Sequence, residues 1–433
     1  MEDILERARK FAEQAEVYEV SHEETPVSFE SNRLKQVQSR QSHWVALRLV
    51  LNGRVGSSTA NDASDVKGLV DKAVEVAQFG PQARFELPGL QAYQNVRVFD
   101  GETNKVTLDE MVELGQSLID ATTAHTKDLL CSARVSRSTT SLSITNSRGG
   151  QAKYRKTTFG LGVYGTLING TDMLFVGDGE NSCHPVKTGK RVTSEVIRQL
   201  EWAKRQATAK TGTNPVVFTP SGVASAFIPA LETAFNGRVV LQGASPLAGK
   251  LGQKMFDERF SLWDDATLPY RPGSRICDDE GVPTRRTALI DGGTVASFYY
   301  DLQTAGMAGT KSTGNGSRSG GSLPGPSSNA LVIAAGDTRF NDMIKDMKEG
   351  LVVEDLMGAE QGNILGGDFS GNVLLGYKVE NGEVVGRVKD TTVGGNVYQI
   401  LKNVKAISKE RKWLGGSLYA PAIYCAGLAV SSK

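Results

Sequence analysis

The chain has 433 residues, 39% of them apolar, and its 49 basic and 48 acidic side chains give a formal net charge of +1. This balance leaves no electrostatic footprint for nucleic acid or for an anionic membrane, so we expect neither as a partner. The four cysteines lie far apart without a C-x-x-C pair, which predicts reduced thiols and a cytoplasmic protein. No window approaches the roughly 18 apolar residues of a membrane-spanning helix, and the charged start does not resemble a secretory signal.

Residues 1–104 are predicted to form an N-terminal α+β domain. Apolar residues at helical spacing from Ile4 to Ala15 predict an opening helix, and Ser64 or Asp65 can cap a second helix that ends before Gly80. Between these helices the period changes to two, which predicts a meander of strands closed by the turn Asn52-Gly53. The predicted strands are residues 17–21, 27–31, 34–39 and 44–51.

Residues 105–212 are predicted to form a central α+β domain with the same order of elements. The pattern Thr107-x-x-Glu110 is a capping box that begins a helix. The strands expected after it are residues 129–136, 140–146, 151–158 and 160–168, and a helix follows at residues 194–208. The similarity of residues 29–33 to residues 144–148 favours a diverged duplication as much as it favours shared turn chemistry.

Residues 213–433 are predicted to form a C-terminal, mostly β domain. A short apolar strand at residues 216–218 leads into a helix that begins near Pro220 and carries apolar residues as far as Ala234. Helical periodicity then nearly disappears, apart from a short helix near residues 341–347, and glycine becomes frequent. This pattern predicts an antiparallel barrel or sandwich with long glycine-rich loops, of which residues 310–328 are expected to be a flexible surface loop. The predicted strands are residues 287–291, 294–300, 330–334, 371–380, 383–388 and 422–431.

The usual catalytic motifs are absent from the sequence. None of the four histidines has a second metal-ligating residue at the spacing of a zinc site, so His22, His43, His125 and His184 are expected to be structural or on the surface. The segment from Gly243 to Lys250 has one residue too many for a phosphate loop, and G-x-S-x-G is missing.

A series of short motifs in the second half of the chain nevertheless resembles one family, the TldD/PmbA proteins. That family is regarded as metallopeptidases and is also labelled modulator of DNA gyrase. The motifs occur in the family's order, and the resemblance is strongest from about residue 215 to residue 430. They are Asp278–Thr284, Leu289–Gly293, Asp301–Ala305, Ser312–Gly316, Gly366–Ser370 and Gly376–Glu383.

The resemblance implies the branch of the family without zinc. The TldD branch carries an H-E-x-x-x-H motif on the helix after the strand, and this motif aligns with Ile228, Pro229 and Thr233 here. Isoleucine has no lone pair, threonine is a poor neutral ligand, and proline cannot act as a general base. The family's metal-binding cysteine near the end of the chain has no counterpart here either. Cys425 lies in an apolar segment that predicts a core strand. The chain therefore resembles TldE or PmbA, with no cofactor of its own and zinc expected only in a TldD-like partner.

The function that the resemblance implies is that of a non-catalytic subunit in a cytosolic peptidase complex that processes peptides or unfolded segments. Two glycine-rich loops, the first at residues 313–318 and the second at residues 366–370, are expected to border a groove in which an extended peptide adds to a sheet edge. The candidate groove residues are Thr313, Gly314, Asn315, Arg318, Gly367, Asp368 and Ser370.

Two alternatives remain open. The chain could be a stand-alone homodimer that captures peptides without cutting them. It could also be a metal-independent hydrolase that uses loop carboxylates in solvated surroundings as acid and base. The carboxylates in question are Asp278, Asp279, Glu280 and Asp368.

Overall fold

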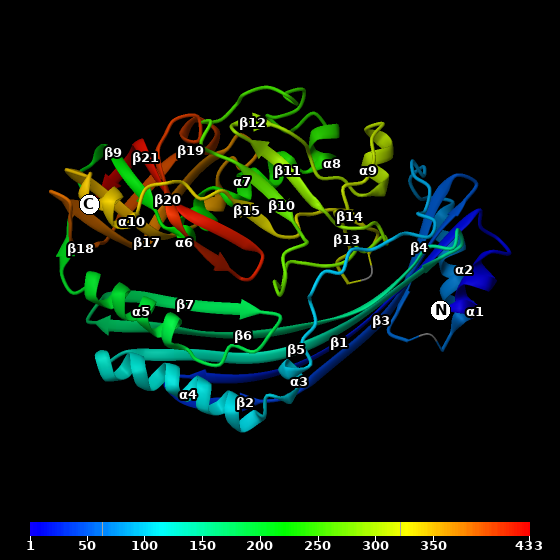
Figure 1. The fold of residues 1–433 in the computed structure, drawn as a ribbon, viewed down its shortest axis with the longest axis horizontal. Coiled ribbons are helices and arrows are strands. Elements are labelled where there is room, and N and C mark those ends of the chain that lie inside the picture. The colour runs from blue at the N-terminus through cyan, green and yellow to red at the C-terminus, as the bar shows by residue number, and fades with distance from the viewer. Residues whose placement is uncertain (63, 321) are drawn as a thin grey trace.

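The computed structural model describes residues 1–62, 64–320 and 322–433. The chain has a mixed α+β fold built on two large sheets (Figure 1). The long strands of the N-terminal sheet run beneath the C-terminal part and curve upward at one end, beside the N-terminus. No helix within these described ranges is long and apolar enough to cross a membrane.

The N-terminal sheet is antiparallel, with strand order β4-β3-β1-β5-β6-β7 and β2 paired to β1. The pairing of β1 with β5 joins the segments predicted as separate domains. Strands on both sides of the expected boundary near residue 104 therefore belong to one sheet. The strands are β1 (Gln14–Glu30), β2 (Arg33–Val37), β3 (Arg40–Leu51), β4 (Arg54–Ala60), β5 (Leu130–Asn146), β6 (Gln151–Asn169) and β7 (Asp172–Ser182).

The strands of this sheet are longer than their periodicity indicates. The predicted strands at residues 17–21 and 27–31 are one strand, β1, and the four predicted between residues 129 and 168 are two, β5 and β6. The polar interval from His22 to Pro26 stays extended because β5 pairs with it throughout, on the side opposite β3. Strands β4 and β7 were not predicted.

Helices pack on the N-terminal sheet, and two of them begin at the N-caps that the sequence predicts. The predicted cap Asp65 accepts a hydrogen bond from the amide of Gly68 and begins α2 (Val66–Ala77), which packs with α1 (Glu2–Ala8) on β1 and β3. The predicted capping box of Thr107 and Glu110 is confirmed at the start of α4 (Leu108–His125). The next helix, α5 (Lys190–Trp202), begins four residues earlier than expected, and the short α3 (Glu102–Lys105) precedes α4.

The C-terminal sheet closes on itself. Strands β21, β9, β16, β17 and β19 form a ring in which each is hydrogen-bonded to the next, and β19 returns to β21. The predicted barrel is thus confirmed, although β9 and β16 run parallel within it. The ring strands are β9 (Gly212–Phe218), β16 (Glu349–Met357), β17 (Asp368–Glu380), β19 (Thr391–Asn396) and β21 (Leu418–Ser432).

Shorter elements extend this sheet and cover it. The helices are α6 (Pro220–Ala226), α7 (Ile228–Phe235), α8 (Gly237–Leu241), α9 (Leu302–Met307), α10 (Phe340–Lys345) and α11 (Val397–Ile400), with the 3-10 turn η1 (Ala359–Gln361). The other strands are β8 (Gln206–Ala207), β10 (Leu262–Asp265), β11 (Arg286–Asp291), β12 (Thr294–Val295), β13 (Gly316–Ser317), β14 (Gly325–Pro326), β15 (Leu331–Ile333), β18 (Glu383–Val388) and β20 (Val404–Leu414). The largest core cluster joins α6 and α7 to the ring, with Phe218, Phe227 and Phe369 in mutual ring contact.

Candidate functional site

The single helix predicted from Pro220 is two helices, α6 and α7, separated at Phe227. The break has a local cause, because Pro229 lacks an N–H for the carbonyl of Ser225 and its ring would collide with that carbonyl in a continuous helix. Thr219 caps the first helix by accepting a hydrogen bond from the amide of Gly222.

The three positions aligned with the metal motif lie in α7. Ile228 is 8% exposed and packs in the core, while the hydroxyl of Thr233 donates to the carbonyl of Pro229 at 2.8 Å. Isoleucine has no lone pair and the threonine hydroxyl is a poor neutral ligand, so these side chains do not offer the atoms that a shared metal ion needs.

Cys425 is a core residue, as predicted. It lies in β21 opposite Val216, is fully buried, and its Sγ is directed at the carbonyl of Ile423, 3.8 Å away. Burial raises the pKa of this thiol well above its ordinary value. In the described ranges, no group of three or more His, Cys, Asp or Glu side chains is placed to hold a metal ion.

The first glycine-rich loop is buried from Thr313 to Gly316, which corrects the expectation of a surface loop for this part, whereas residues 319, 320, 322 and 323 of the same tract are exposed. Asn315 is 1% exposed and donates to Asp264, and the amide of Gly316 donates to Asp278 at 2.8 Å. The amide of Arg318 donates to Asp279, also at 2.8 Å. Thr313 and Gly314 are buried too, while Gly321 lies outside the described residues. The amides of Gly316 and Arg318 are therefore already engaged by carboxylates.

The carboxylates of residues 278–280 are buried as well, so the expectation of solvated loop acids is wrong for them. Asp278 and Glu280 are fully buried and Asp279 is 6% exposed. Asp278 accepts hydrogen bonds from backbone amides, while Asp279 and Glu280 are paired with cations. Arg48 of β3 contacts Glu280 at 2.6 Å and Glu16 of β1 at 3.1 Å, Arg318 contacts Glu16, and Arg275 contacts Asp279 at 3.2 Å. We call these six side chains, which join β1 and β3 of the N-terminal sheet to loops of the C-terminal half, the inter-sheet ion network.

Burial raises the pKa values of two acids at this network. It raises the pKa of Glu280 to about 6, with Arg48 acting in the opposite direction and Asp301 adding to the rise. It also raises the pKa of the neighbouring Asp278, to which the charge of Glu280 contributes. Asp278, Asp279 and Glu280 line none of the five main cavities among the described residues.

The second glycine-rich loop is more open. Asp368 and Ser370 are exposed, and Asn396 donates to Asp368 at 2.7 Å. Gly367 has a φ of +82°, and a Cβ there would lie 2.4 Å from the ring of Tyr398. The Tyr398 hydroxyl lies within hydrogen-bond distance of two carbonyls, that of Leu365 in this loop (3.4 Å) and that of Ala230 in α7 (3.2 Å).

Helix α7 therefore links the two candidate loops. On one side it contacts Tyr398 and the second loop; on the other, Glu232 accepts a hydrogen bond from Ser328 at 2.6 Å, beyond the first loop. Asn236, just after α7, donates to the carbonyl of Pro326 at 2.9 Å. No hydrogen bond within the described ranges joins the two loops directly. Their role in binding a peptide stays a prediction.

Two family models match the chain. The model described as PmbA/TldA metallopeptidase C-terminal domain matches residues 211–432, just over half of the sequence, and the model for PmbA/TldA metallopeptidase domain 1 matches residues 15–77. The chain belongs to the PmbA/TldD family. The C-terminal match begins at β9, close to the predicted boundary at residue 213.

Relatives from both branches of the PmbA/TldD family are similar to this chain. An uncharacterized protein of Methanocaldococcus jannaschii is 25% identical over 436 residues, which cover 99% of each chain. A metalloprotease PmbA homolog of Haemophilus influenzae is 24% identical, with 94% of this chain and 90% of the relative aligned. A metalloprotease TldD homolog of Buchnera aphidicola subsp. Acyrthosiphon pisum is 29% identical, over 51% of this chain and 48% of its own.

Solved structures of PmbA/TldD proteins share the whole fold. TldE from Thermococcus kodakarensis has a TM-score of 0.90 at 24% identity and covers 100% of this chain and 99% of its own. A Thermotoga maritima protein named for modulation of DNA gyrase has a TM-score of 0.88 at 20% identity, with 99% and 100% covered. At these identities the likeness establishes the fold.

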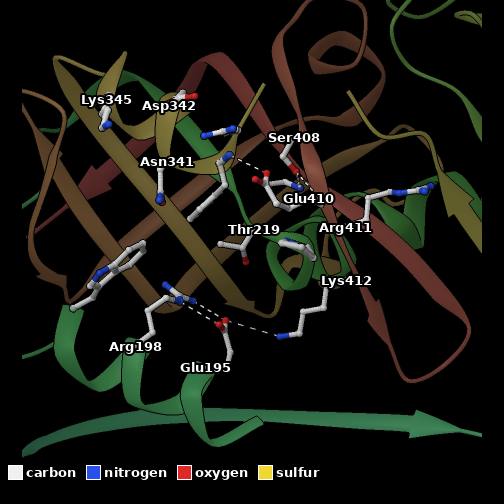
Figure 2. A pocket seen from close by; sticks show the side chains of 15 residues that line it. Glu195, Arg198, Thr219, Asn341, Asp342, Lys345, Ser408, Glu410, Arg411 and Lys412 are labelled. Carbon is white, nitrogen blue, oxygen red and sulfur yellow. Dashed lines mark hydrogen bonds and ion pairs between the residues drawn. The ribbon is translucent and has the colours of Figure 1, made fainter. Parts of the chain in front are cut away.

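A cavity of about 630 Å³ lies between α5, α10 and β20, and its residues were not among the predicted site residues (Figure 2). A sequence signal was present, since Glu195, Arg198 and Trp202 recur at helical spacing on α5. That spacing is also typical of a solvated helix face, so it does not indicate a cavity until α10 and β20 are placed opposite.

Proposed function

We propose that this chain is the non-catalytic, metal-free subunit of a TldD/TldE-type metallopeptidase in the cytoplasm. It pairs with a zinc-bearing sister, and the complex processes peptides or unfolded segments. The observation that carries the proposal is α7, a helix kept in place with Ile228, Pro229 and Thr233 at the positions of the family's metal motif.

The chemistry of these residues supports a subunit without its own zinc. A catalytic zinc site needs about three protein ligands that carry lone pairs, together with a base near the bound water. Ile228 is buried in the core and Thr233 donates its hydroxyl proton to the backbone, so neither is poised as a ligand. Cys425 is enclosed in β21.

An exposed apolar face supports pairing with another subunit. Tyr164 and Ile168 of β6 share a sheet face with Met173 and Phe175 of β7, because opposite residues in an antiparallel pair point the same way. Their exposed fractions are 63%, 52%, 48% and 38%. Apolar side chains gathered on one exposed sheet face are typical of a protein interface. Four free, buried cysteines fit a reducing compartment.

The test is to purify the chain alone and after co-expression with a TldD-like protein, and to measure zinc and peptide hydrolysis in both. We expect zinc and activity only when the sister is present, and loss of association in Phe175→Asp. Lys127→Glu, an exposed charge change in the loop after α4, is the matched control and should leave association intact. Stoichiometric zinc in the isolated chain, or hydrolysis by it that survives chelators, would overturn the proposal.

The isolated chain from the same preparation also tests the homodimeric alternative. Sedimentation of the isolated chain at several concentrations distinguishes a monomer that waits for its sister from a self-paired dimer. Retention of a peptide by that dimer without turnover would favour a stand-alone binding module.

A further inference from the structure

The cavity between α5, α10 and β20 has no residue of α7 or of either glycine-rich loop in its lining, so it is separate from the candidate site around α7. Its volume of about 630 Å³ falls within the range of small-molecule sites. The lining is formed by Glu195, Arg198, Trp202, Thr219, Pro220, Arg339, Phe340, Asn341, Asp342, Lys345, Ser408, Glu410, Arg411, Lys412 and Ala422.

Arg198 presents an unused donor at this cavity. Its Nη2 contacts Glu195 at 2.7 Å and also the buried Glu354, and its guanidinium lies 4.3 Å from the ring centre of Trp202. These contacts hold the side chain in one orientation. Its Nη1 is buried and has no hydrogen-bond partner among the described residues. A buried N–H group without an acceptor is unfavourable, so an oxygen atom from a ligand would satisfy it.

The wall beside Arg198 is aromatic. The rings of Trp202 and Phe340 are nearly parallel, with an interplanar angle of 16° and centroids 6.3 Å apart. Phe340 is held there because its amide donates to Glu410 of β20 at 3.0 Å. The pair gives an apolar surface against which a ring or a branched aliphatic group can pack.

The mouth of the cavity is positive. Arg339 and Lys345 are exposed and form no ion pair within the described residues, and Asn341 points into the space from α10 (Figure 2). Lys412 is already paired with Asp178 at 2.7 Å and reaches toward Glu195. Asp342 and Glu410 are the opposing charges, and the contact of Glu410 with α10 is a hydrogen bond from a backbone amide. The lining as a whole has five basic side chains against three acidic ones, and this excess of positive charge favours an anion.

We propose that this cavity binds a carboxylate-bearing ligand with an apolar body, of the size of a short peptide end. One oxygen of the ligand accepts from Nη1 of Arg198, the apolar body packs on Trp202 and Phe340, and the negative charge faces Arg339 and Lys345. A peptide carboxyl terminus and a free aromatic acid carry this same chemistry. The proposal does not depend on the presence or absence of zinc at α7.

The experiment titrates the full chain with N-acetyl-Glu-Phe, with its C-terminal amide and with 3-phenylpropionate, by calorimetry. We expect one saturable site for the free acid and about tenfold weaker binding of the amide, the loss typical of a charge-assisted hydrogen bond. Equal binding of phenylpropionate and the dipeptide would assign the site to free acids, and much weaker binding would assign it to peptide ends.

Two surface variants test the location without touching the buried floor. Arg339→Glu and Lys345→Glu should each weaken binding of N-acetyl-Glu-Phe about threefold or more, while Lys127→Glu leaves it unchanged. Ligand-dependent quenching of tryptophan fluorescence should disappear in Trp202→Phe. No saturation with any probe, or unchanged affinity in both mouth variants, would overturn the proposal.

Discussion

Arg48 of β3 donates a hydrogen bond of 2.6 Å to Glu280, 232 positions later in the chain, and both side chains are buried. The same guanidinium contacts Glu16 of β1, so one cation serves a carboxylate from each half of the molecule. This contact lies at the centre of the inter-sheet ion network, and it carries the first prediction.

Arg48→Met should destabilise the protein by about 3–5 kcal/mol, because removing one partner of a buried ion pair leaves the other charge unpaired. Lys35→Met is the matched control. Lys35 and Glu30 form an exposed pair at 3.2 Å, so the control should change the unfolding free energy by about 0.5 kcal/mol or less. Urea unfolding of both variants measures the difference, and equal effects would contradict a stabilising role for the network.

The raised pKa of Glu280 predicts a specific pH dependence of the unfolding free energy. Because its pKa is raised to about 6 in the folded protein, the folded state holds this proton more tightly than the unfolded chain. The resulting stabilisation is complete below the unfolded pKa and is lost as pH rises through about 6, a change of about 2 kcal/mol.

Glu280→Gln removes this titration. The difference in unfolding free energy between the parent and the variant should therefore fall by roughly 1.6 kcal/mol from pH 4.5 to pH 7, because the unfolded glutamate is already half ionised at pH 4.5. Urea midpoints at several pH values give this difference. A difference that does not change with pH would show that Glu280 titrates normally.

At Gly306 of α9, substitution by alanine should lower stability, opposite to the usual effect of this change in a helix. A Cβ at this position would lie 1.5 Å from the carbonyl oxygen of Arg84, so Gly306→Ala should destabilise by about 1–3 kcal/mol. Helix propensity alone predicts a gain of about 1 kcal/mol. Gly101→Ala meets nothing within 4 Å and should be nearly neutral, and thermal unfolding of the pair distinguishes the two effects.

The four thiols should be unreactive in the folded protein. All four cysteines are buried, and burial raises the pKa of Cys183 to about 11, which disfavours the reactive thiolate. A thiol reagent such as 5,5′-dithiobis(2-nitrobenzoate) should label less than about one group per native chain and all four in guanidinium chloride. Rapid labelling of a native thiol would indicate that its surroundings open.

Local signals predicted local structure well. The capping box at Thr107, the cap at Asp65 and the hairpin turn at Asn52-Gly53 all lie where a few neighbouring residues determine the backbone. The strand through His22 to Pro26 was divided because its polar residues break the period, whereas its extension depends on β3 and β5 from other parts of the chain.

The candidate site was only partly predictable for the same reason. The composition of residues 312–318 is that of a surface loop, and its burial depends on carboxylates at residues 264 and 278–279 that are distant in sequence. The chemistry of Ile228, Pro229 and Thr233 could be read directly, but the break at Phe227 shows that their directions depend on backbone geometry. The cavity beside Arg198 needed three separate elements to meet.

Strand β21 has a consequence for the order of folding during synthesis. It pairs with β9, β15, β19 and β20, and it completes the ring, yet it is made last among the ring's strands. Every strand of the N-terminal sheet has been synthesised by Ser182, so that sheet can form while the ring still lacks its closing strand. Until residues 418–432 emerge from the ribosome, β9 and β19 keep open edges, and the nascent chain is most exposed to mispairing during this interval.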